Sequence, residues 1–167
     1  MKSIQADIAI VDILVEAGAL VSQLDDGTIC VRRAPLEGFK IDLNNAPDLF
    51  PIVSVLAAFC AGESRIAGLG RLAGKESDRA AAITEMLQQM GVEAEAQGDE
   101  LIVQGETLVG RLLGGRLLRG GSYSSHHDHR MAMALSVASL GADGPVEIDD
   151  TACVGKSFPD FFETFRV

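Results

Sequence analysis

Residues 78–103 read DRAAAITEMLQQMGVEAEAQGDELIV, and this stretch carries three structural signals in succession. Apolar side chains first recur at helical spacing, at Ile83, Met86, Leu87 and Met90. Gly91 ends that pattern, as glycine commonly does after the last turn of a helix. Two short apolar runs then flank Gly98-Asp99-Glu100, which has the turn chemistry of a hairpin. The stretch predicts a helix followed by two antiparallel strands.

The same succession occurs near the start of the chain. An apolar-periodic stretch begins at Asp7 and ends at Gly18, and the acidic turn Asp25-Asp26-Gly27 precedes a second apolar run. The spacing matches in both copies: four residues from Leu14 to Gly18 and from Leu87 to Gly91, and fifteen from Leu14 to Ile29 and from Leu87 to Ile102. This match indicates an internal repeat.

Two further stretches, residues 48–61 and 130–140, predict helices that are apolar almost all round and therefore buried on most faces. Short strands are expected beside them, at residues 39–43, 65–69 and 146–148. The predicted fold class is α+β, with repeated β-α-β-α-β-β units, buried helices and exposed sheets. We expect about two such units, residues 1–70 and 71–167. The first copy lacks the strand and buried helix that would precede it, so we expect the chain to be part of a longer protein.

Composition narrows the class of protein. The 167 residues are 47% hydrophobic, enough for a real core, and 24 Asp and Glu against 14 Lys and Arg leave a net charge of −10, which argues against nucleic-acid binding. The sequence contains no run of eighteen apolar residues, so no membrane span is predicted. A signal peptide is not expected either, and the predicted location is therefore the cytoplasm. The sequence has three cysteines, Cys30, Cys60 and Cys153. We interpret them as buried free thiols, and the alternative is that one of them is a nucleophile.

Charged residues gather at four predicted helix starts. They are Asp48; Lys75, Glu76 and Arg79; Asp128, His129 and Arg130; and Lys156, which precedes a predicted cap at Ser157 and first helical turn at residues 157–159. Each aspartate has a plain structural explanation, because an N-cap is worth about 1 kcal/mol. The cations do not, because the positive end of the helix dipole repels them. Together, Arg79, Arg130 and Lys156 would form a site for a bound dianion, and Glu76 could move a proton there.

Two other segments have less specific interpretations. His126-His127-Asp128-His129 could suggest a metal site, but neighbours at these spacings do not easily share one tetrahedral centre, so we favour a polar loop and expect no metal. Residues 107–121 are rich in glycine, leucine and arginine. We expect a strand and a flexible loop there rather than a phosphate-cradling loop, because the usual glycine motifs do not occur.

These motifs carry a family resemblance. Asn45-Ala46-Pro47-Asp48 followed by residues 75–79 (KESDR) resembles the C-terminal domain of 3-phosphoshikimate 1-carboxyvinyltransferase, or EPSP synthase. Residues 128–133 (DHRMAM), 156–162 (KSFPDFF) and the SIQ-x-D pattern at 3–7 extend the likeness over essentially the whole chain. The related enolpyruvyl transferase acting on UDP-N-acetylglucosamine shares the fold but usually lacks the pairing of KESDR, at residues 75–79 here, with DHR, at residues 128–130.

The resemblance implies an enolpyruvyl transferase-like fold of two domains, each with three of these units around buried parallel helices and with outer mixed sheets. It implies that the domains close on the substrates and that the reaction needs no metal or organic cofactor. It also implies transfer of the carboxyvinyl group of phosphoenolpyruvate to the 5-hydroxyl of shikimate 3-phosphate, with release of phosphate. By resemblance, Asp48 accepts the hydroxyl proton and Glu76 protonates the methylene carbon. The implied substrate-binding residues are Lys75, for the shikimate phosphate, and Arg79, Arg130 and Lys156, for phosphoenolpyruvate, with Asp128 and His129 as further candidates.

The implied partner is the missing N-terminal domain of the same enzyme, without which we expect this chain to be inactive. The alternative function is a non-catalytic anion-binding module that retains the fold. A His-rich metal-binding domain is a third, weaker alternative.

Overall fold

The computed structural model of the chain describes residues 6–32, 34–73, 78–106 and 118–165. Its central part is one complete β-α-β-α-β-β unit. The elements of this unit are β3 (Lys40–Asp42), α2 (Phe50–Phe59), β4 (Glu63–Ala67), α3 (Arg79–Gln89), β5 (Glu93–Gln97) and β6 (Glu100–Gln104). They confirm the predicted order of elements, including the helix and hairpin expected within residues 78–103.

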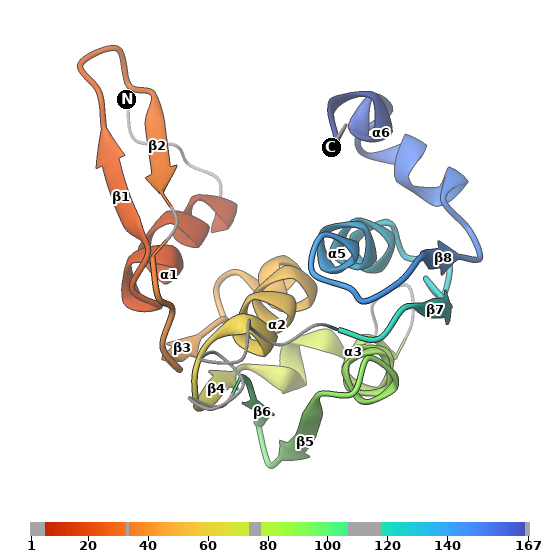
Figure 1. Cartoon of the computed structure of the whole chain (residues 1–167). Coiled ribbons are helices and arrows are strands. Elements are labelled where there is room, and N and C mark those ends of the chain that lie inside the picture. The colour runs from red at the N-terminus through yellow and green to blue at the C-terminus, as the bar shows by residue number, and fades with distance from the viewer. Residues whose placement is uncertain (1–5, 33, 74–77, 107–117, 166–167) are drawn as a thin grey trace.

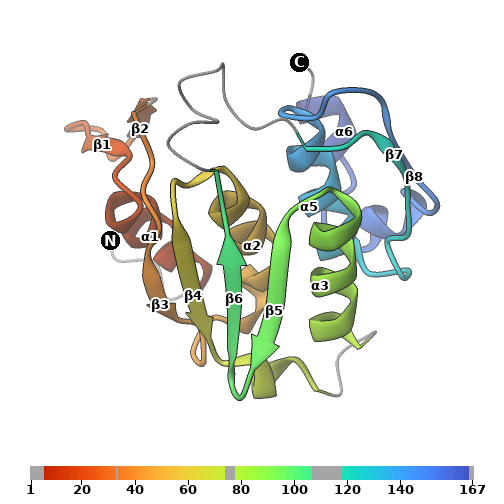
Figure 2. The same cartoon turned by 60° about the horizontal axis from the view of Figure 1, so that its bottom comes forward.

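The four strands of this unit form one mixed sheet in the order β3-β4-β6-β5. β3 and β4 are parallel, whereas β4 pairs antiparallel with β6, and β6 antiparallel with β5. Figure 2 shows the sheet from its outer face, with α2 behind it and α3 beside β5. The sheet takes strands from both sides of residue 70, so the expected division at residues 70 and 71 falls inside it.

Half-units flank the central unit on both sides. Before it come the short helix η1 (Ala6–Ile8), α1 (Ala9–Glu16) and the antiparallel hairpin of β1 (Leu20–Gln23) and β2 (Ile29–Arg32), which match α3, β5 and β6. After it come β7 (Gly121–Tyr123), α5 (His129–Ser139) and β8 (Val146–Ile148). β7 and β8 are parallel, as β3 and β4 are. In Figure 1 the β1–β2 hairpin extends at the upper left, and the C-terminal segment with α6 lies at the upper right, above α5.

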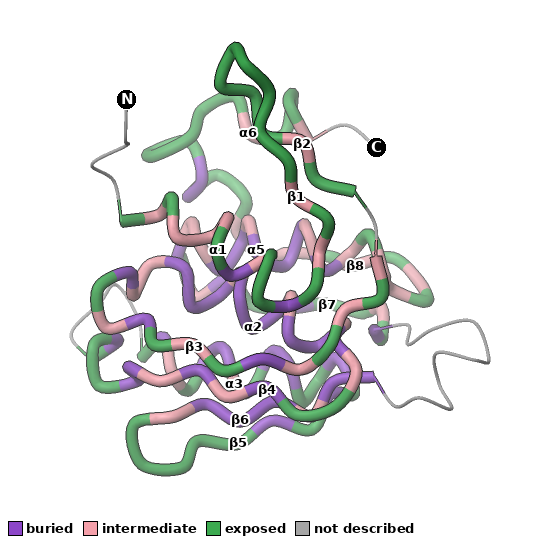
Figure 3. Tube along the Cα trace, turned by 90° about the vertical axis from the view of Figure 1, so that its left-hand side faces the viewer, coloured by how far each residue is buried: buried purple, intermediate pink, exposed green. Residues whose placement is uncertain are grey.

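The core lies around α2, which contacts α3, α5, β4 and β6. Figure 3 shows the buried positions concentrated in this interior, while the β1–β2 hairpin is largely exposed. Seven of the ten residues of α2 are buried, which confirms that this helix is apolar all round because it is enclosed. Its buried hydroxyl is satisfied within the helix, since Ser54 Oγ donates to Phe50 O at 2.7 Å.

Gly105 allows the sheet to approach the end of α2. A Cβ atom at this position would lie 2.0 Å from Cys60 O and 2.5 Å from Ala57 O, so no larger residue fits without a backbone shift. The backbone amide of Gly105 donates to Gly62 O at 2.9 Å, which fixes this approach.

The C-terminal segment differs from the prediction. A short helix η4 (Ala152–Lys156) ends at Lys156, and α6 (Phe161–Thr164) begins only after Asp160. The expected cap and first helical turn at residues 157–159 are therefore wrong: Pro159 and Asp160 form a turn before α6. Lys156 consequently does not lie at the start of a helix. Cys153 and Val154 of η4 instead pack with Ala132 in a small apolar cluster that anchors this segment on α5.

Other expectations were confirmed in part. The strand expected at residues 65–69 runs from Glu63 to Ala67, and a short helix η3 (Leu69–Leu72) follows it. Of the glycine-rich segment 107–121, residues 107–117 lie outside the described residues, so the strand and loop expected there stay predictions; of the described part only Gly121 belongs to a strand, as the first residue of β7. Cys60 and Cys153 are buried free thiols, whereas Cys30 is only half-buried. Within the described ranges, no helix has both the length and the apolar character needed to cross a bilayer.

Candidate active site

The N-terminal ends of three helical segments meet in one place. Asp78 caps α3 by accepting a hydrogen bond from Ala81 N at 3.3 Å. Asp128 caps α5 by accepting one from Arg130 N at 2.9 Å. Asp48 lies in the short helix η2 (Pro47–Leu49), immediately before α2. The expected N-cap roles of Asp78 and Asp128 are therefore confirmed, and both caps place an arginine in the first turn of the helix.

Arg79, the first residue of α3, is held between two carboxylates. Its Nε donates to Asp128 Oδ2 at 2.7 Å and its Nη1 to Asp48 Oδ1 at 2.9 Å. The Arg79 side chain is 3% exposed and that of Asp128 is fully buried. Burial alone lowers the pKa of Arg79, but the bond to Asp128 and then that to Asp48 outweigh it, so the pKa lies above its ordinary value. Arg79 is thus a buried, charged link between three elements.

Arg130 occupies a more open position. Its Nη2 lies 3.0 Å from Asp48 Oδ2, and its Nη1 lies 3.6 Å from Asp7 Oδ2, a residue of η1. The Arg130 side chain is 27% exposed and that of Asp7 is 47% exposed. Asp48 therefore bridges the two arginines with its two oxygens, while the longer and more exposed contact with Asp7 is easily replaced.

This geometry changes the electrostatic argument made from the sequence. The negative charge that balances Arg79 at its helix start comes from Asp48 and Asp128, so a bound anion is not required to explain that arginine. Arg130 remains the cation of this cluster with an accessible side chain. We call Asp48, Arg79, Asp128 and Arg130 the four-residue cluster.

An open hollow of about 220 Å³ lies beside the four-residue cluster. Asp48 and Arg130 form its polar end. The rest of its lining is apolar and comes from η2, α2, α5 and α6: Leu49, Pro51, Ile52, Met133, Ala134, Val137 and Phe161. A small anion would therefore bind at the charged end, because the apolar wall offers it no hydrogen-bond donors.

The remaining predicted site residues are not all brought into this cluster. Lys75 and Glu76 lie outside the described residues. His129 is half-buried in the first turn of α5, and Lys156 is exposed at the end of η4, which contacts α5. Within the described ranges, Lys156 forms no ion pair with the four-residue cluster, and no three His, Cys, Asp or Glu side chains converge as metal ligands.

Comparison with known proteins assigns the fold and these motifs to a family. The family model for EPSP synthase (3-phosphoshikimate 1-carboxyvinyltransferase) matches residues 1–165. The chain belongs to the EPSP synthase family. The 3-phosphoshikimate 1-carboxyvinyltransferase of Natronomonas pharaonis is 43% identical over 97% of this chain, and that of Brachyspira hyodysenteriae is 41% identical over 98%. The chain spans only 35% and 37% of the length of these two relatives.

Solved structures support the same assignment. An EPSP synthase from Acinetobacter baumannii superposes with a TM-score of 0.77 and 29% identity, covering 93% of this chain and 37% of that one. The enolpyruvyl transferase NikO from Streptomyces tendae has a TM-score of 0.66 at 17% identity, covering 95% of this chain and 34% of that one, and so shares the fold. The α+β, enolpyruvyl transferase-like fold class is thereby confirmed.

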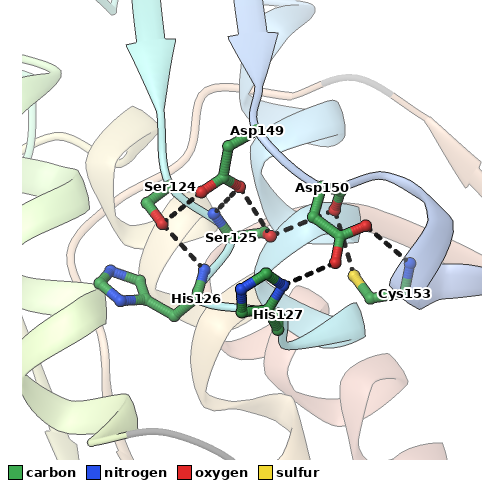
Figure 4. A network of polar contacts seen from close by, with 7 residues as sticks. All are labelled: Ser124, Ser125, His126, His127, Asp149, Asp150 and Cys153. Atoms are coloured by element: carbon green, nitrogen blue, oxygen red, sulfur yellow. Dashed lines mark hydrogen bonds and ion pairs between the residues drawn. The ribbon is translucent and has the colours of Figure 1, made fainter.

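Several residues near the four-residue cluster were not predicted as functional from the sequence. Asp7 was noted as the start of a helix and as part of a motif, but its contact with Arg130 joins residues far apart in the chain. Ser124, Ser125, Asp149 and Asp150 form a polar network beside α5 (Figure 4). The one available signal was the pair of adjacent aspartates directly after a predicted strand.

Proposed function

We propose that this chain supplies one side of the active site of 3-phosphoshikimate 1-carboxyvinyltransferase. The reaction joins the 5-hydroxyl oxygen of shikimate 3-phosphate to C2 of phosphoenolpyruvate while a proton adds to the C3 methylene carbon. The resulting tetrahedral adduct then loses phosphate and a proton from C3, which leaves the carboxyvinyl ether. The observation that carries the proposal is the convergence of Asp48, Arg79, Asp128 and Arg130 at three helix starts in a chain of this family.

Arg130 is the residue that we assign to direct contact with phosphoenolpyruvate. Its guanidinium is accessible, and an incoming carboxylate or phosphate can replace the long contact with Asp7. A planar guanidinium can bind two oxygens of such a group at once. The first turn of α5 adds favourable backbone dipoles for an anion. Lys156 adds a further positive charge if the segment around η4 moves toward this end of α5.

Arg79 has a supporting role in this proposal. Because its side chain is buried between two carboxylates, it fixes Asp48 and the cap of α5 relative to each other. Phosphoenolpyruvate would then meet an arginine whose neighbours are already ordered, which reduces the entropy lost on binding. Asp128 and His129 act at this same helix start, by capping the helix and by lining the approach to Arg130.

Asp48 and Glu76 are assigned the proton transfers. Asp48 is 34% exposed at the polar end of the hollow, where a hydroxyl group could approach it. Glu76, three residues before Arg79 in the sequence, is assigned the protonation of the methylene carbon. Lys75, its neighbour, is assigned to the phosphate of shikimate 3-phosphate.

We further propose that the chain does not catalyse the reaction alone. It spans about a third of the length of its enzyme relatives, and the hollow beside the cluster is open to solvent. Orientation of two substrates and exclusion of water require a second wall. The partner is the N-terminal domain of the same enzyme, and the apolar side of the hollow is one surface that it would cover.

The test is reconstitution. The chain alone should show no transfer, whereas mixing it with the remaining part of an EPSP synthase should restore turnover, measured as phosphate release that depends on both substrates. Enzyme turnover on the order of 1 per second by the chain alone would contradict the proposal. Restored turnover that survives Arg130→Ala unchanged would contradict the role of Arg130.

A titration of the isolated chain with phosphate tests the anion site separately. We expect binding no tighter than roughly millimolar, weakened by salt because Arg130 is partly exposed to water. Arg130→Lys should weaken it, because a point charge replaces a bidentate fork. Phosphate binding without any restored turnover would favour the alternative, a non-catalytic anion-binding module.

A further inference from the structure

A polar network joins the end of β8 to the turn that precedes α5 (Figure 4). Asp149 is its first anchor. Asp149 Oδ2 accepts a hydrogen bond from Ser124 Oγ at 2.6 Å, and Asp149 Oδ1 accepts one from Ser125 N at 2.8 Å. Ser125 Oγ also lies 2.9 Å from Asp149 Oδ1 and 3.1 Å from Asp150 O. One exposed carboxylate therefore holds both serines at the end of β7.

Asp150 is the second anchor, and it reaches the next part of the turn. Asp150 Oδ2 lies 2.8 Å from His127 Nδ1. Asp150 Oδ1 accepts a hydrogen bond from Cys153 N at 3.2 Å, which ties the same side chain to η4. The two adjacent aspartates, which directly follow β8, therefore bind the turn at different residues: Asp149 at Ser124 and Ser125, and Asp150 at His127.

The turn between these anchors has an unusual backbone. His126 and His127 have φ angles of 54° and 57°, and they are the non-glycine residues with positive φ in the described part of the chain. This left-handed conformation is uncommon for residues with a Cβ atom, so it persists where surrounding contacts over-determine it. The contacts of Asp149 and Asp150 supply that constraint.

The held turn leads directly to the four-residue cluster. Asp128 N donates to the carbonyl of Ser125 at 2.9 Å, and Ser125 is fully buried. Asp128 in turn caps α5, because its Oδ1 accepts a hydrogen bond from Arg130 N, and its Oδ2 accepts one from Arg79 Nε. A path of hydrogen bonds therefore runs from Asp149 through Ser125 and Asp128 to the side chain of Arg79 and to the backbone amide of Arg130.

We propose that Asp149 and Asp150 are positioning residues for the anion site. They hold the left-handed turn at His126 and His127, and this turn fixes the direction in which Asp128 and α5 present Arg130. Neither aspartate touches the substrate. The inference rests on the proposed function for its consequence in binding, whereas its structural part, the orientation of Asp128, stands independently.

Asp149→Asn and Asp150→Asn test the proposal in the full chain. Each substitution keeps the size of the side chain and removes its charge. We expect amide NMR shifts to change along residues 125–131 and the Arg79 Nε–H resonance to move, because its bond to Asp128 reorients. Phosphate affinity should fall by about tenfold, the change that corresponds to about 1.4 kcal/mol.

Asp143→Asn is the matched control. Asp143 Oδ1 accepts a hydrogen bond from Gly120 N at 2.7 Å, so it also ties a carboxylate to the β7 segment, but before β7 rather than after it. This variant should shift amides near Gly120 and leave both the Arg79 Nε–H resonance and phosphate affinity unchanged. Urea unfolding of all variants shows whether each is folded under the conditions of titration.

Ser124→Ala provides a second variant if Asp149→Asn fails to fold, because it removes one of the bonds to Asp149 and the bond that Ser124 Oγ accepts from His126 N at 3.1 Å. The proposal is overturned if folded variants keep the Arg79 Nε–H resonance and the amides of α5 in place. It is also overturned if Asp143→Asn perturbs the cluster as strongly as they do. If the unchanged chain does not bind phosphate, the proposed anion site fails, while the NMR shifts still decide the positioning role.

Discussion

At the scale of single residues, Asp128 is the most constrained group of the candidate site. It is fully buried, it caps α5, and it binds the buried Arg79. Replacing one partner of a buried ion pair leaves the other charge poorly compensated. Asp78 offers a contrast, because it caps α3 from an exposed position.

We predict that Asp128→Asn lowers the free energy of unfolding by about 3 kcal/mol, near the lower end for a broken buried pair because Arg79 keeps Asp48. Asp78→Asn should be nearly neutral, since asparagine caps a helix about as well as aspartate. Urea unfolding of both variants measures the difference. Equal losses would mean that capping, rather than the ion pair, dominates the contribution of Asp128.

At the scale of elements, local sequence signals predicted the order of helices and strands. Gly18 and Gly91 end their helices with φ of 94° and 81°, and this left-handed geometry is why glycine marks those boundaries. The start of α6 could not be found in the same way. Asp160 makes no side-chain capping bond, so the sequence carried no true cap there, and Ser157 was a misleading signal.

The site was predictable only in part, for a physical reason. A cation in the first turn of a helix is visible in the sequence, but its partner is not, because Arg79 and Asp128 lie forty-nine positions apart and meet only through the packing of α3 and α5. The same holds for Asp149 and Ser125, which meet because β7 and β8 are parallel neighbours. Pairings of this kind come from topology rather than from local propensity.

The contact between β6 and α2 gives a prediction at this scale. Gly105→Ala should lower the free energy of unfolding by about 1–3 kcal/mol, because the added methyl group meets the carbonyl oxygens of Cys60 and Ala57. Gly155→Ala is the matched control, since nothing lies within 4 Å of a Cβ atom there. Thermal unfolding measures the melting temperatures of both variants. Similar values would show that the backbone at the end of α2 shifts to accommodate the methyl group at little cost in stability.

Asp149 gives a second prediction, which concerns the stability of the fold at low pH. Its hydrogen bond from Ser124, and then that from the backbone of Ser125, lower its pKa from 3.8 to about 2. A carboxyl group with a lowered pKa stabilises the fold above its unfolded pKa, and this stabilisation is lost as the pH falls through the folded pKa. Because Asp149 is exposed, water screens part of the effect.

The unchanged chain should therefore be more stable than Asp149→Asn near neutral pH, and this advantage should narrow as the pH falls from 3.8 toward about 2. Urea unfolding at a series of pH values measures the difference. A constant difference across that range would mean that the Asp149 carboxylate contributes nothing as a charged group.

At the scale of the whole molecule, the proposed function makes this chain one wall of an active site that needs a second wall. The four-residue cluster and the hollow lie at the same end of α2 and α5, and the segment that carries Lys156 packs on α5 through Cys153 and Val154. A partner domain that covers the hollow would thus meet the charged end and the apolar wall together. Assembly and catalysis should then be separable, because they use different residues.

The substitution Glu76→Gln should separate assembly with the partner domain from catalysis. In the reconstituted enzyme this change keeps size and hydrogen bonding but removes the transferable proton, so kcat should fall by roughly a hundredfold to ten-thousandfold while KM changes little. The variant should still bind the partner domain, and excess variant should therefore inhibit reconstitution by the unchanged chain. Phosphate release measured in such mixtures tests both statements. If the variant neither inhibits nor turns over, Glu76 serves assembly, and if it turns over at the unchanged rate with chemistry rate-limiting, it is not the proton donor.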